Sequence, residues 1–290
     1  MAGIERYAAP TSLEQAVAAL HEERGEVTIL AGGTDLMPQQ RAGRLRPKRL
    51  LMSIRRVAEL RGVALSDGAL HVGALTTITE LMRDALVRRW APVLAEAADR
   101  FASDQIRNVG TIGGNVCNAS PAGDMLVPLL ALDARAELAS LADGELRRRE
   151  LPLGAFFVGP GKTSRAPSEL LTAVRVPLPP AGHVARFAKF GTRPALDISV
   201  ASVAVAGVLQ GQALRDVRVA FGAVAPTPMR AARTERALEG RPLDAATIEA
   251  AAAVAREEVA PIDDVRATAW YRRELVHTMT KRILVDVTQR

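Results

Sequence analysis

Two glycine-rich segments contain the residue types that could bind an anionic cofactor. Residues 29–38 read ILAGGTDLMP, and residues 106–128 read IRNVGTIGGNVCNASPAGDMLVP. Glycine lets backbone N–H groups approach an anion closely, and it adopts the φ > 0 conformations that a tight turn can require. Short hydrogen-bonding side chains follow the glycines in both segments. This combination would suit a pyrophosphate joined to a ribitol chain.

Each glycine segment taken alone has an ordinary alternative, a turn between two strands that binds nothing. The presence of two such polar segments in one chain favours a single phosphate site with one segment on each side. Neither contains G-x-G-x-x-G, so the fingerprint of nicotinamide-type βαβ folds is absent. Residues 157–163, FVGPGKT, imitate the end of a P-loop, but Phe156 stands where that pattern requires glycine. We therefore exclude a P-loop nucleotide site.

The backbone of the first segment and the start of the second are our candidates for the two sides of the pyrophosphate. Backbone donors stabilise phosphate charges without bringing a counter-charge. The candidates in the first segment are Ala31, Gly32, Gly33, Thr34, Asp35 and Leu36. Those in the second segment are Thr111, Gly114 and Asn115. Cys117 is the one cysteine, and no histidine lies near it in the sequence, so we expect it to pack rather than to act as a nucleophile.

The elements that position the first segment are predicted to form a compact β-α-β unit. Apolar residues recur with a helical period over residues 12–21, where Thr11 or Ser12 could cap the helix. Residues 27–30 and 50–53 are short apolar runs of the kind that form buried strands.

Further strands and helices are predicted around the second segment. Apolar periodicity and turn residues indicate strands at 69–72 and 170–177, helices at 78–84, 93–100 and 125–132, and a hairpin of 136–140 with 145–150 around Asp143-Gly144. Residues 177–180, PLPP, form the clearest linker. After it we expect strands at 198–209 and 214–224, a sheet ended by Pro226 and Pro228, and helices at 231–238, 244–259 and 267–285. The predicted fold class is α+β, with a two-subdomain α/β cofactor-binding region followed by a C-terminal α+β domain of antiparallel sheet and helices.

Composition narrows the classes of protein that this chain can belong to. Of its 290 residues 48% are hydrophobic but only 3% are aromatic, so the cores must be aliphatic. The net charge is +6, yet the arginines are scattered rather than gathered in a basic stripe with aromatics, which argues against nucleic-acid binding. One cysteine excludes a disulfide within the chain, argues against a cysteine-ligated cluster, and fits a reducing, cytoplasmic compartment. No apolar run reaches the roughly 18 residues of a membrane span.

The two glycine segments together resemble those of a known family. AGGTDL at 31–36 and RNVGTIGGNVCNASPAGD at 107–124 closely resemble the FAD-binding medium subunit of molybdenum hydroxylases. That family includes the flavoprotein subunit of carbon monoxide dehydrogenase and the flavin domain of xanthine dehydrogenase. The resemblance covers essentially the whole chain. It implies a PCMH-type FAD-binding region with subdomains at 1–55 and 56–177, a C-terminal domain at 181–290, and FAD between the two subdomains.

The resemblance also implies further cofactor contacts. Positions like Ser120, Asp124 and Lys189 approach FAD in the family, and Leu170 aligns with an apolar contact to it. A positive charge near the flavin ring would stabilise reduced anionic flavin. Two alternatives remain open at this point: Asp124 could instead cap the helix expected at 125–132, and Lys189 could be an exposed strand lysine.

The function implied by the resemblance is electron relay within a larger complex. A large subunit would hold the molybdenum cofactor and a small subunit two [2Fe–2S] clusters, in a dimer of heterotrimers. This chain would pass electrons from the clusters to quinone, NAD or oxygen. Two other readings are a self-sufficient FAD-dependent oxidase or reductase, which would need its own substrate base, and a non-catalytic assembly protein, against which the intact glycines argue.

Overall fold

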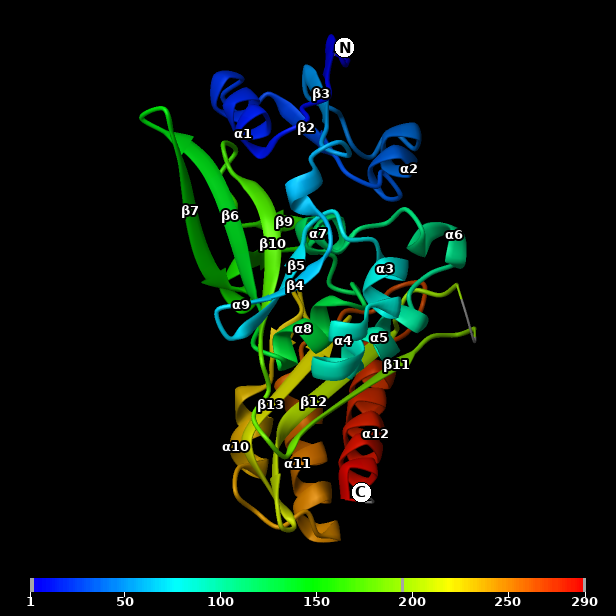
Figure 1. Cartoon of the computed structure of the whole chain (residues 1–290). Coiled ribbons are helices and arrows are strands. Elements are labelled where there is room, and N and C mark those ends of the chain that lie inside the picture. The colour runs from blue at the N-terminus through cyan, green and yellow to red at the C-terminus, as the bar shows by residue number, and fades with distance from the viewer. Residues whose placement is uncertain (1–2, 194–195, 289–290) are drawn as a thin grey trace.

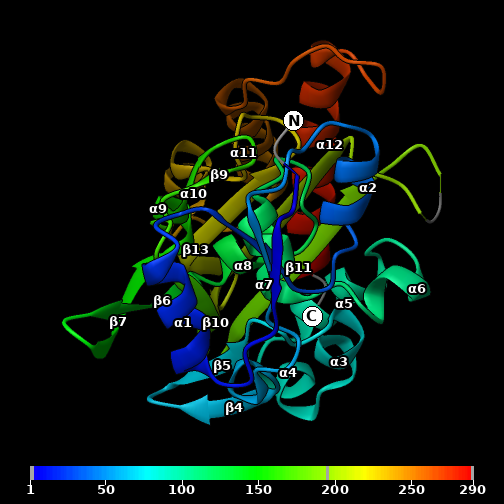
Figure 2. The ribbon, with the colours of Figure 1, turned by 90° about the horizontal axis from the view of Figure 1, so that it is seen from above.

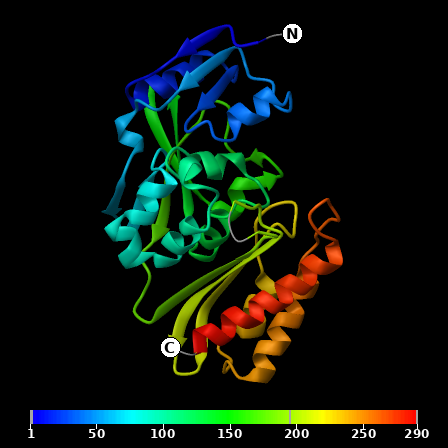
Figure 3. The ribbon, with the colours of Figure 1, turned by 90° about the vertical axis from the view of Figure 1, so that its right-hand side faces the viewer.

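The computed structural model describes residues 3–193 and 196–288 as an α+β fold with three main sheets. Figure 3 shows the N-terminal sheet at one end of an elongated molecule, the second sheet and its helices in the middle, and the C-terminal sheet with its helices at the other end. None of the helices in the described residues is long and apolar enough to cross a membrane.

The first sheet is parallel, with strand order β1-β3-β2. Its strands are β1 (Arg6–Ala8), β2 (Val27–Leu30) and β3 (Leu50–Ser53), and its helices are α1 (Leu13–Glu22) and α2 (Leu36–Arg41). Ser12 caps α1 by accepting a hydrogen bond from the N–H of Gln15, as predicted. The predicted β-α-β unit is therefore confirmed, with β1 as an additional strand.

The second sheet is antiparallel throughout, with order β4-β5-β10-β6-β7. Its strands are β4 (Val63–Ser66), β5 (Ala69–Gly73), β6 (Arg135–Ala142), β7 (Glu145–Pro152) and β10 (Leu170–Pro177). The hairpin β6–β7 turns at Asp143-Gly144, where both residues have positive φ, as a two-residue hairpin turn requires.

Helices between β5 and β6 cover one face of this sheet (Figure 1). They are α3 (Ile78–Arg83), α4 (Ala85–Trp90), α5 (Pro92–Asp99), α6 (Asp104–Arg107), α7 (Ile112–Asn118) and α8 (Leu126–Ala131). The short elements η1 (Ala58–Leu60), α9 (Leu153–Phe156), β8 (Phe157–Gly159) and β9 (Lys162–Thr163) complete the region. The core between these helices and the sheet is almost entirely aliphatic, as the composition requires.

The third sheet is antiparallel, with order β11-β12-β13-β14. Its strands are β11 (His183–Phe190), β12 (Ala201–Gln210), β13 (Ala213–Gly222) and β14 (Met229–Arg230), and its helices are α10 (Ala232–Leu238), α11 (Ala245–Glu258) and α12 (Ala269–Thr288). Valines of β12 and β13 face these helices, while alanines of the same strands join the core that contains α8. Figure 2 shows the strands of this sheet passing beneath α7 and α8.

Two predictions for the third sheet are wrong. The strand expected at 198–209 begins only at Ala201, because Ile198 lies in an irregular and exposed segment. Pro226 and Pro228 do not end the sheet: the chain turns through them and pairs again as β14 against β13.

Candidate functional site

The two predicted glycine segments lie in direct contact. A Cβ built on Gly32 would lie 2.2 Å from the carbonyl oxygen of Val109 and 3.1 Å from the Cα of Gly110. A Cβ built on Gly110 would lie 3.3 Å from Oγ1 of Thr34. Real side chains do not approach backbone that closely, so only glycine allows this contact at position 32. The fold thus brings together two segments that are far apart in the sequence.

The first segment carries backbone donors without a protein acceptor. It is the turn between β2 and α2, and Gly33 holds a positive φ of 77° in it. Within the described residues, no acceptor takes the N–H groups of Gly32, Gly33, Thr34 or Asp35. The Asp35 side chain accepts from Nε2 of Gln39 at 2.5 Å and does not cap α2. Because backbone donors need partners, these N–H groups are available to an anion or to solvent.

The second segment is built differently from the prediction. Gly113 and Gly114 do not form a φ > 0 turn; they lie in the first turn of α7, which Thr111 caps through the N–H of Gly114 at 3.0 Å. The N–H groups of residues 112, 113 and 115 also have protein acceptors: the carbonyl oxygens of Thr76, Ala74 and Thr111. Gly113 is required for close packing, since its Cβ would lie 2.6 Å from that of Ala74.

Three groups of the second segment remain available to a ligand. The N–H of Thr111 has no acceptor within the described residues. Oδ1 of Asn115 is buried and has no hydrogen-bond partner there. Gly114 is exposed, so its bare Cα leaves room beside α7. The side chain of Asn115 and the N–H of Thr111 are thus better candidates for cofactor contacts than the N–H of Gly114.

Asp124 and Lys189 form a buried ion pair. Nζ of Lys189 lies 2.5 Å from Oδ2 of Asp124, and Oγ of Ser199 donates to Oδ1 at 2.6 Å. Burial raises the pKa of Asp124, an effect that Lys189 and Ser199 oppose. Asp124 is not the cap of α8, and Lys189 is not an exposed strand lysine, so neither of these two alternatives holds.

The remaining predicted residues lie close to the two segments but in different settings. Ser120 follows α7 and accepts from the N–H of Ala122 at 3.3 Å. Leu170, which is 2% exposed, lies in the core cluster against which Ala31 packs. Leu36 begins α2. Burial raises the pKa of Cys117 to about 11, so this thiol is protonated and packs against the core as expected.

A cavity of about 400 Å³ opens where the two segments meet. Ala31, Gly32 and Thr111 line it, together with residues that the sequence reasoning missed: Arg55, Arg61, Leu75, Thr77, Thr79, Glu80, Asn108 and Val109. Asn108 and Val109 belong to the second glycine segment itself, whereas the others lie after β3 or around the start of α3, where no glycine-rich pattern marks them. The adjacent arginines at 55 and 56, directly after a predicted strand, were the one available sequence cue.

The residues present fit a pyrophosphate-bearing cofactor. Gly32 and Thr111, whose N–H groups have no protein acceptor in the described chain, line the cavity together with Arg55 and Arg61, and all of these groups can donate to phosphate oxygens. Within residues 3–193 and 196–288, no group of three or more histidine, cysteine or acidic side chains could hold a metal ion.

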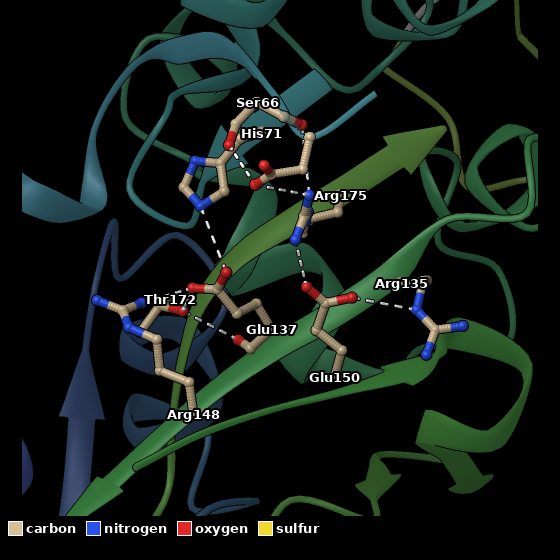
Figure 4. Close-up of polar contacts among 9 residues, drawn as sticks. Ser66, His71, Arg135, Glu137, Arg148, Glu150, Thr172 and Arg175 are labelled. Carbon is tan, nitrogen blue, oxygen red and sulfur yellow. Dashed lines mark hydrogen bonds and ion pairs between the residues drawn. The ribbon is translucent and has the colours of Figure 1, made fainter. Parts of the chain in front are cut away.

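A second cavity, of about 320 Å³, lies between α1 and the outer face of the second sheet. Figure 4 shows its polar side chains, which pair with one another. Glu137 contacts Arg148 and Thr172 at 2.6 Å each, and Nε2 of His71 lies 3.7 Å away. Arg175 bridges to Glu150 at 2.6 Å. Because these charges are already paired, the network fits a structural role better than an ionic ligand.

The family models and the individual proteins that resemble this chain agree with one another. Residues 3–179 match the model described as the FAD binding domain in molybdopterin dehydrogenase, and residues 186–287 match that of the CO dehydrogenase flavoprotein C-terminal domain. The chain is 38% identical over 264 residues to the xanthine dehydrogenase FAD-binding subunit of Escherichia coli O157:H7, covering 90% of this chain and 88% of that one. It is 32% identical over 278 residues to the carbon monoxide dehydrogenase medium chain of Hydrogenophaga pseudoflava, covering 96% and 95%.

Solved structures show the same fold. Carbon monoxide dehydrogenase from Hydrogenophaga pseudoflava superposes with a TM-score of 0.91 at 32% identity, covering 97% of this chain and 96% of that one. Quinoline 2-oxidoreductase from Pseudomonas putida 86 superposes with a TM-score of 0.90 at 28% identity, covering 100% and 98%.

Proposed function

The chain belongs to the family of FAD-binding subunits of molybdenum hydroxylases, and from that premise we propose that it relays electrons from [2Fe–2S] clusters of a partner subunit to an external acceptor. Its cofactor is FAD. The observation that carries the proposal is the contact between the two glycine segments, with free backbone donors on the first and the free N–H of Thr111 on the second. Bound FAD can exchange single electrons with clusters and electron pairs with an acceptor.

The residues of this chain would bind and orient the cofactor rather than act on an organic substrate. Gly32, Gly33, Thr34 and Asp35 would hold the pyrophosphate through their N–H groups, and the N–H of Thr111 would face it from the other side. The amide oxygen of Asn115 is an acceptor, so it would suit a hydroxyl or N–H group of the cofactor rather than a phosphate. We propose that Ser120, Asp124, Leu170 and Lys189 lie along the remainder of the cofactor, as in the resembled family. The Lys189–Asp124 pair supports this by fixing an ammonium group at the junction of the middle region and β11.

We propose that the partners are a molybdopterin-binding large subunit and a [2Fe–2S] small subunit, in a dimer of heterotrimers. The names of the relatives, "subunit" and "medium chain", support a multi-subunit complex.

The acceptor in this proposal is quinone, NAD or oxygen, and the single cysteine supports a cytoplasmic location. We further propose the domain division 1–55, 56–177 and 181–290, which the separate sheets support.

Anaerobic mixing tests the relay. Candidate substrates such as purines, aldehydes, N-heterocycles or carbon monoxide are added to the FAD-loaded chain while the flavin absorbance is followed. The measurement is then repeated with the cluster and molybdenum subunits present. We expect bleaching only in the complete complex. Rapid bleaching of the isolated chain by one of these substrates would identify a self-sufficient flavin enzyme, and failure to retain any flavin would favour a non-catalytic assembly protein.

A further inference from the structure

Two arginines line the cavity at the contact of the glycine segments and have no acidic partner within the described residues. Arg55 follows β3 and Arg61 follows η1, and both belong to the wall of the 400 Å³ cavity. Nη2 of Arg61 donates to the carbonyl oxygen of Arg55 at 3.0 Å, which fixes the two residues relative to each other. By contrast, Lys48 and Arg49, on the approach to β3, pair with Glu26 and Glu5.

The same cavity wall contains backbone donors that carry no net charge. The N–H groups of Gly32 and Thr111 have no protein acceptor in the described chain. Such donors orient a phosphate but do not neutralise it, whereas FAD brings two phosphate charges. Glu80 also lines the cavity, but its carboxylate accepts from the N–H of Thr77 at 2.7 Å within the capping box of α3. Two guanidinium groups against one carboxylate leave the wall with one positive charge in excess.

We propose that Arg55 and Arg61 supply the counter-charge for the phosphates of FAD. Guanidinium groups suit this role because their donors match phosphate oxygens and they remain charged at all relevant pH values. FAD affinity then has an ionic component that depends on the segment after β3, in addition to the neutral backbone donors. The inference rests on the assignment of FAD as cofactor and not on the electron-relay proposal.

One consequence is that free ADP should compete with FAD. ADP carries the same adenosine and phosphates, so it can use the same arginines and backbone donors. The attraction between the arginines and the phosphates would explain both why ADP competes and why it competes less well in variants that lack an arginine.

The test uses the full chain freed of flavin, with R55Q and R61Q as variants and R56Q as matched control. Arg56 is exposed and adjacent in sequence but is not part of the cavity wall. FAD affinity is measured by the change in flavin fluorescence on binding, at low and at higher salt. We expect R55Q and R61Q each to weaken FAD binding by about five- to twentyfold at low salt, with a smaller loss at higher salt, since charge-assisted hydrogen bonds to phosphate are screened. R56Q should bind FAD as the wild type does.

Lysine variants and ADP competition separate the loss of charge from other effects of the substitutions. R55K and R61K retain the charge and should keep much of the salt dependence that the glutamine variants lose. ADP competition should weaken in R55Q and R61Q by a factor similar to that for FAD. If both glutamine variants bind FAD and ADP as R56Q does, the arginines are not counter-charges and the inference is overturned. A wild-type chain that binds no FAD at all would instead overturn the cofactor assignment itself.

Discussion

At the scale of single residues, three glycines of the site are required for three different physical reasons. Gly32 allows backbone-to-backbone contact with Val109, Gly33 holds a left-handed φ in the turn, and Gly113 lets α7 pack against Ala74. These roles cannot be told apart from the sequence, where all three are simply glycines in polar segments. They predict different consequences for substitution.

Alanine at Gly33 and at Gly114 should separate backbone strain from cofactor contact. At Gly33 a Cβ would lie 2.9 Å from Cδ1 of Leu30 and the positive φ adds a cost, so G33A should lower the free energy of unfolding by about 1–2 kcal/mol. Gly114 has no positive φ, and its exposed Cβ would meet only Oγ1 of Thr111, at 3.0 Å. G114A should therefore change stability by less than about 1 kcal/mol, since helix propensity offsets a disturbed cap.

Both variants should nevertheless bind FAD more weakly. Urea unfolding of the flavin-free chain gives the stability, and equilibrium binding gives the affinity. If G114A binds FAD as tightly as the wild type does, the surface of α7 at Gly114 does not face the cofactor. If G33A is as stable as the wild type, the strained turn does not depend on glycine at that position.

At the scale of elements, the outer face of the second sheet carries a charged network beside the apolar contacts that β6 and β10 make with α1. Glu137 on β6 is at its centre, with Arg148 from β7, Thr172 from β10 and His71 from β5 around it (Figure 4). Contact with His71, followed by Thr172 and Arg148, lowers the pKa of Glu137 to about 2 despite its burial.

This pKa predicts a specific acid sensitivity. A carboxyl group with a folded-state pKa below its ordinary value of 4.5 stabilises the fold above pH 4.5 and loses that contribution as the pH falls toward 2. Arg148 is half exposed, so solvent screens its interaction with Glu137 and the pKa shift overstates the stabilisation. We therefore expect Glu137→Gln to lower the free energy of unfolding near neutral pH by about 2 kcal/mol. The difference from the wild type should shrink as the pH falls through this window.

The control is Glu145→Gln on the same hairpin, where the exposed carboxylate pairs only with the exposed Arg147. We expect E145Q to change the free energy of unfolding by less than about 1 kcal/mol at any pH. An E137Q variant whose deficit stays constant down to the lowest measurable pH would show that the network acts through packing and not through charge.

Elements with a strong local pattern could be predicted from the sequence, whereas those created by tertiary pairing could not. The helix α1 and the hairpin β6–β7 have an apolar period and a turn signal of their own. By contrast, β1 and β14 have three and two residues, and they are strands only because β3 and β13 lie beside them. The glycines in α7 were also predicted wrongly as a turn, because their low helix propensity is overridden by packing against Ala74, which follows β5, and by the Thr111 cap.

The residues of the site also divide into those with a local sequence pattern and those that only the tertiary structure brings together. The free donors of Gly32 and Gly33 could be predicted because glycine marks them, whereas the N–H groups of Gly113 and Gly114 are satisfied within the fold. The resemblance predicted Asp124 and Lys189 as cofactor contacts. Their pairing with each other depends on β11 reaching back to the segment before α8, which no local pattern records. Arg55 and Arg61 carry no local signal beyond charge, so only the cavity identifies them.

At the scale of the whole molecule, the C-terminal sheet packs closely against the FAD-binding region. A Cβ on Gly222 of β13 would lie 2.5 Å both from Cγ2 of Val127 in α8 and from Oγ of Ser202. The N–H of Ala223 donates to the carbonyl oxygen of Pro121 at 2.7 Å. The Lys189–Asp124 pair crosses the same interface, with both side chains 9% exposed.

A double-mutant cycle on this pair tests whether it couples docking to cofactor binding. K189M leaves Asp124 buried without its cation and should lower the free energy of unfolding by about 3–5 kcal/mol. With Lys189 absent, burial keeps the pKa of Asp124 above its ordinary value of 3.8. A raised folded-state pKa stabilises at low pH and is lost as the pH rises, so K189M should be more destabilised near pH 8 than near pH 5.

The double variant K189M/D124L removes both charges and should recover most of that stability, because replacing a buried pair by apolar residues is often close to neutral. Its FAD affinity should stay below that of the wild type, since we propose that both side chains also face the cofactor. Urea unfolding at several pH values measures the first quantity, and flavin binding to the same preparations measures the second. The cycle is completed by D124L alone. If the losses of stability in K189M and in D124L add up to that of the double variant, the ion pair does not hold the interface. Recovered FAD affinity in the stable double variant would confine the pair to a structural role between β11 and the segment before α8.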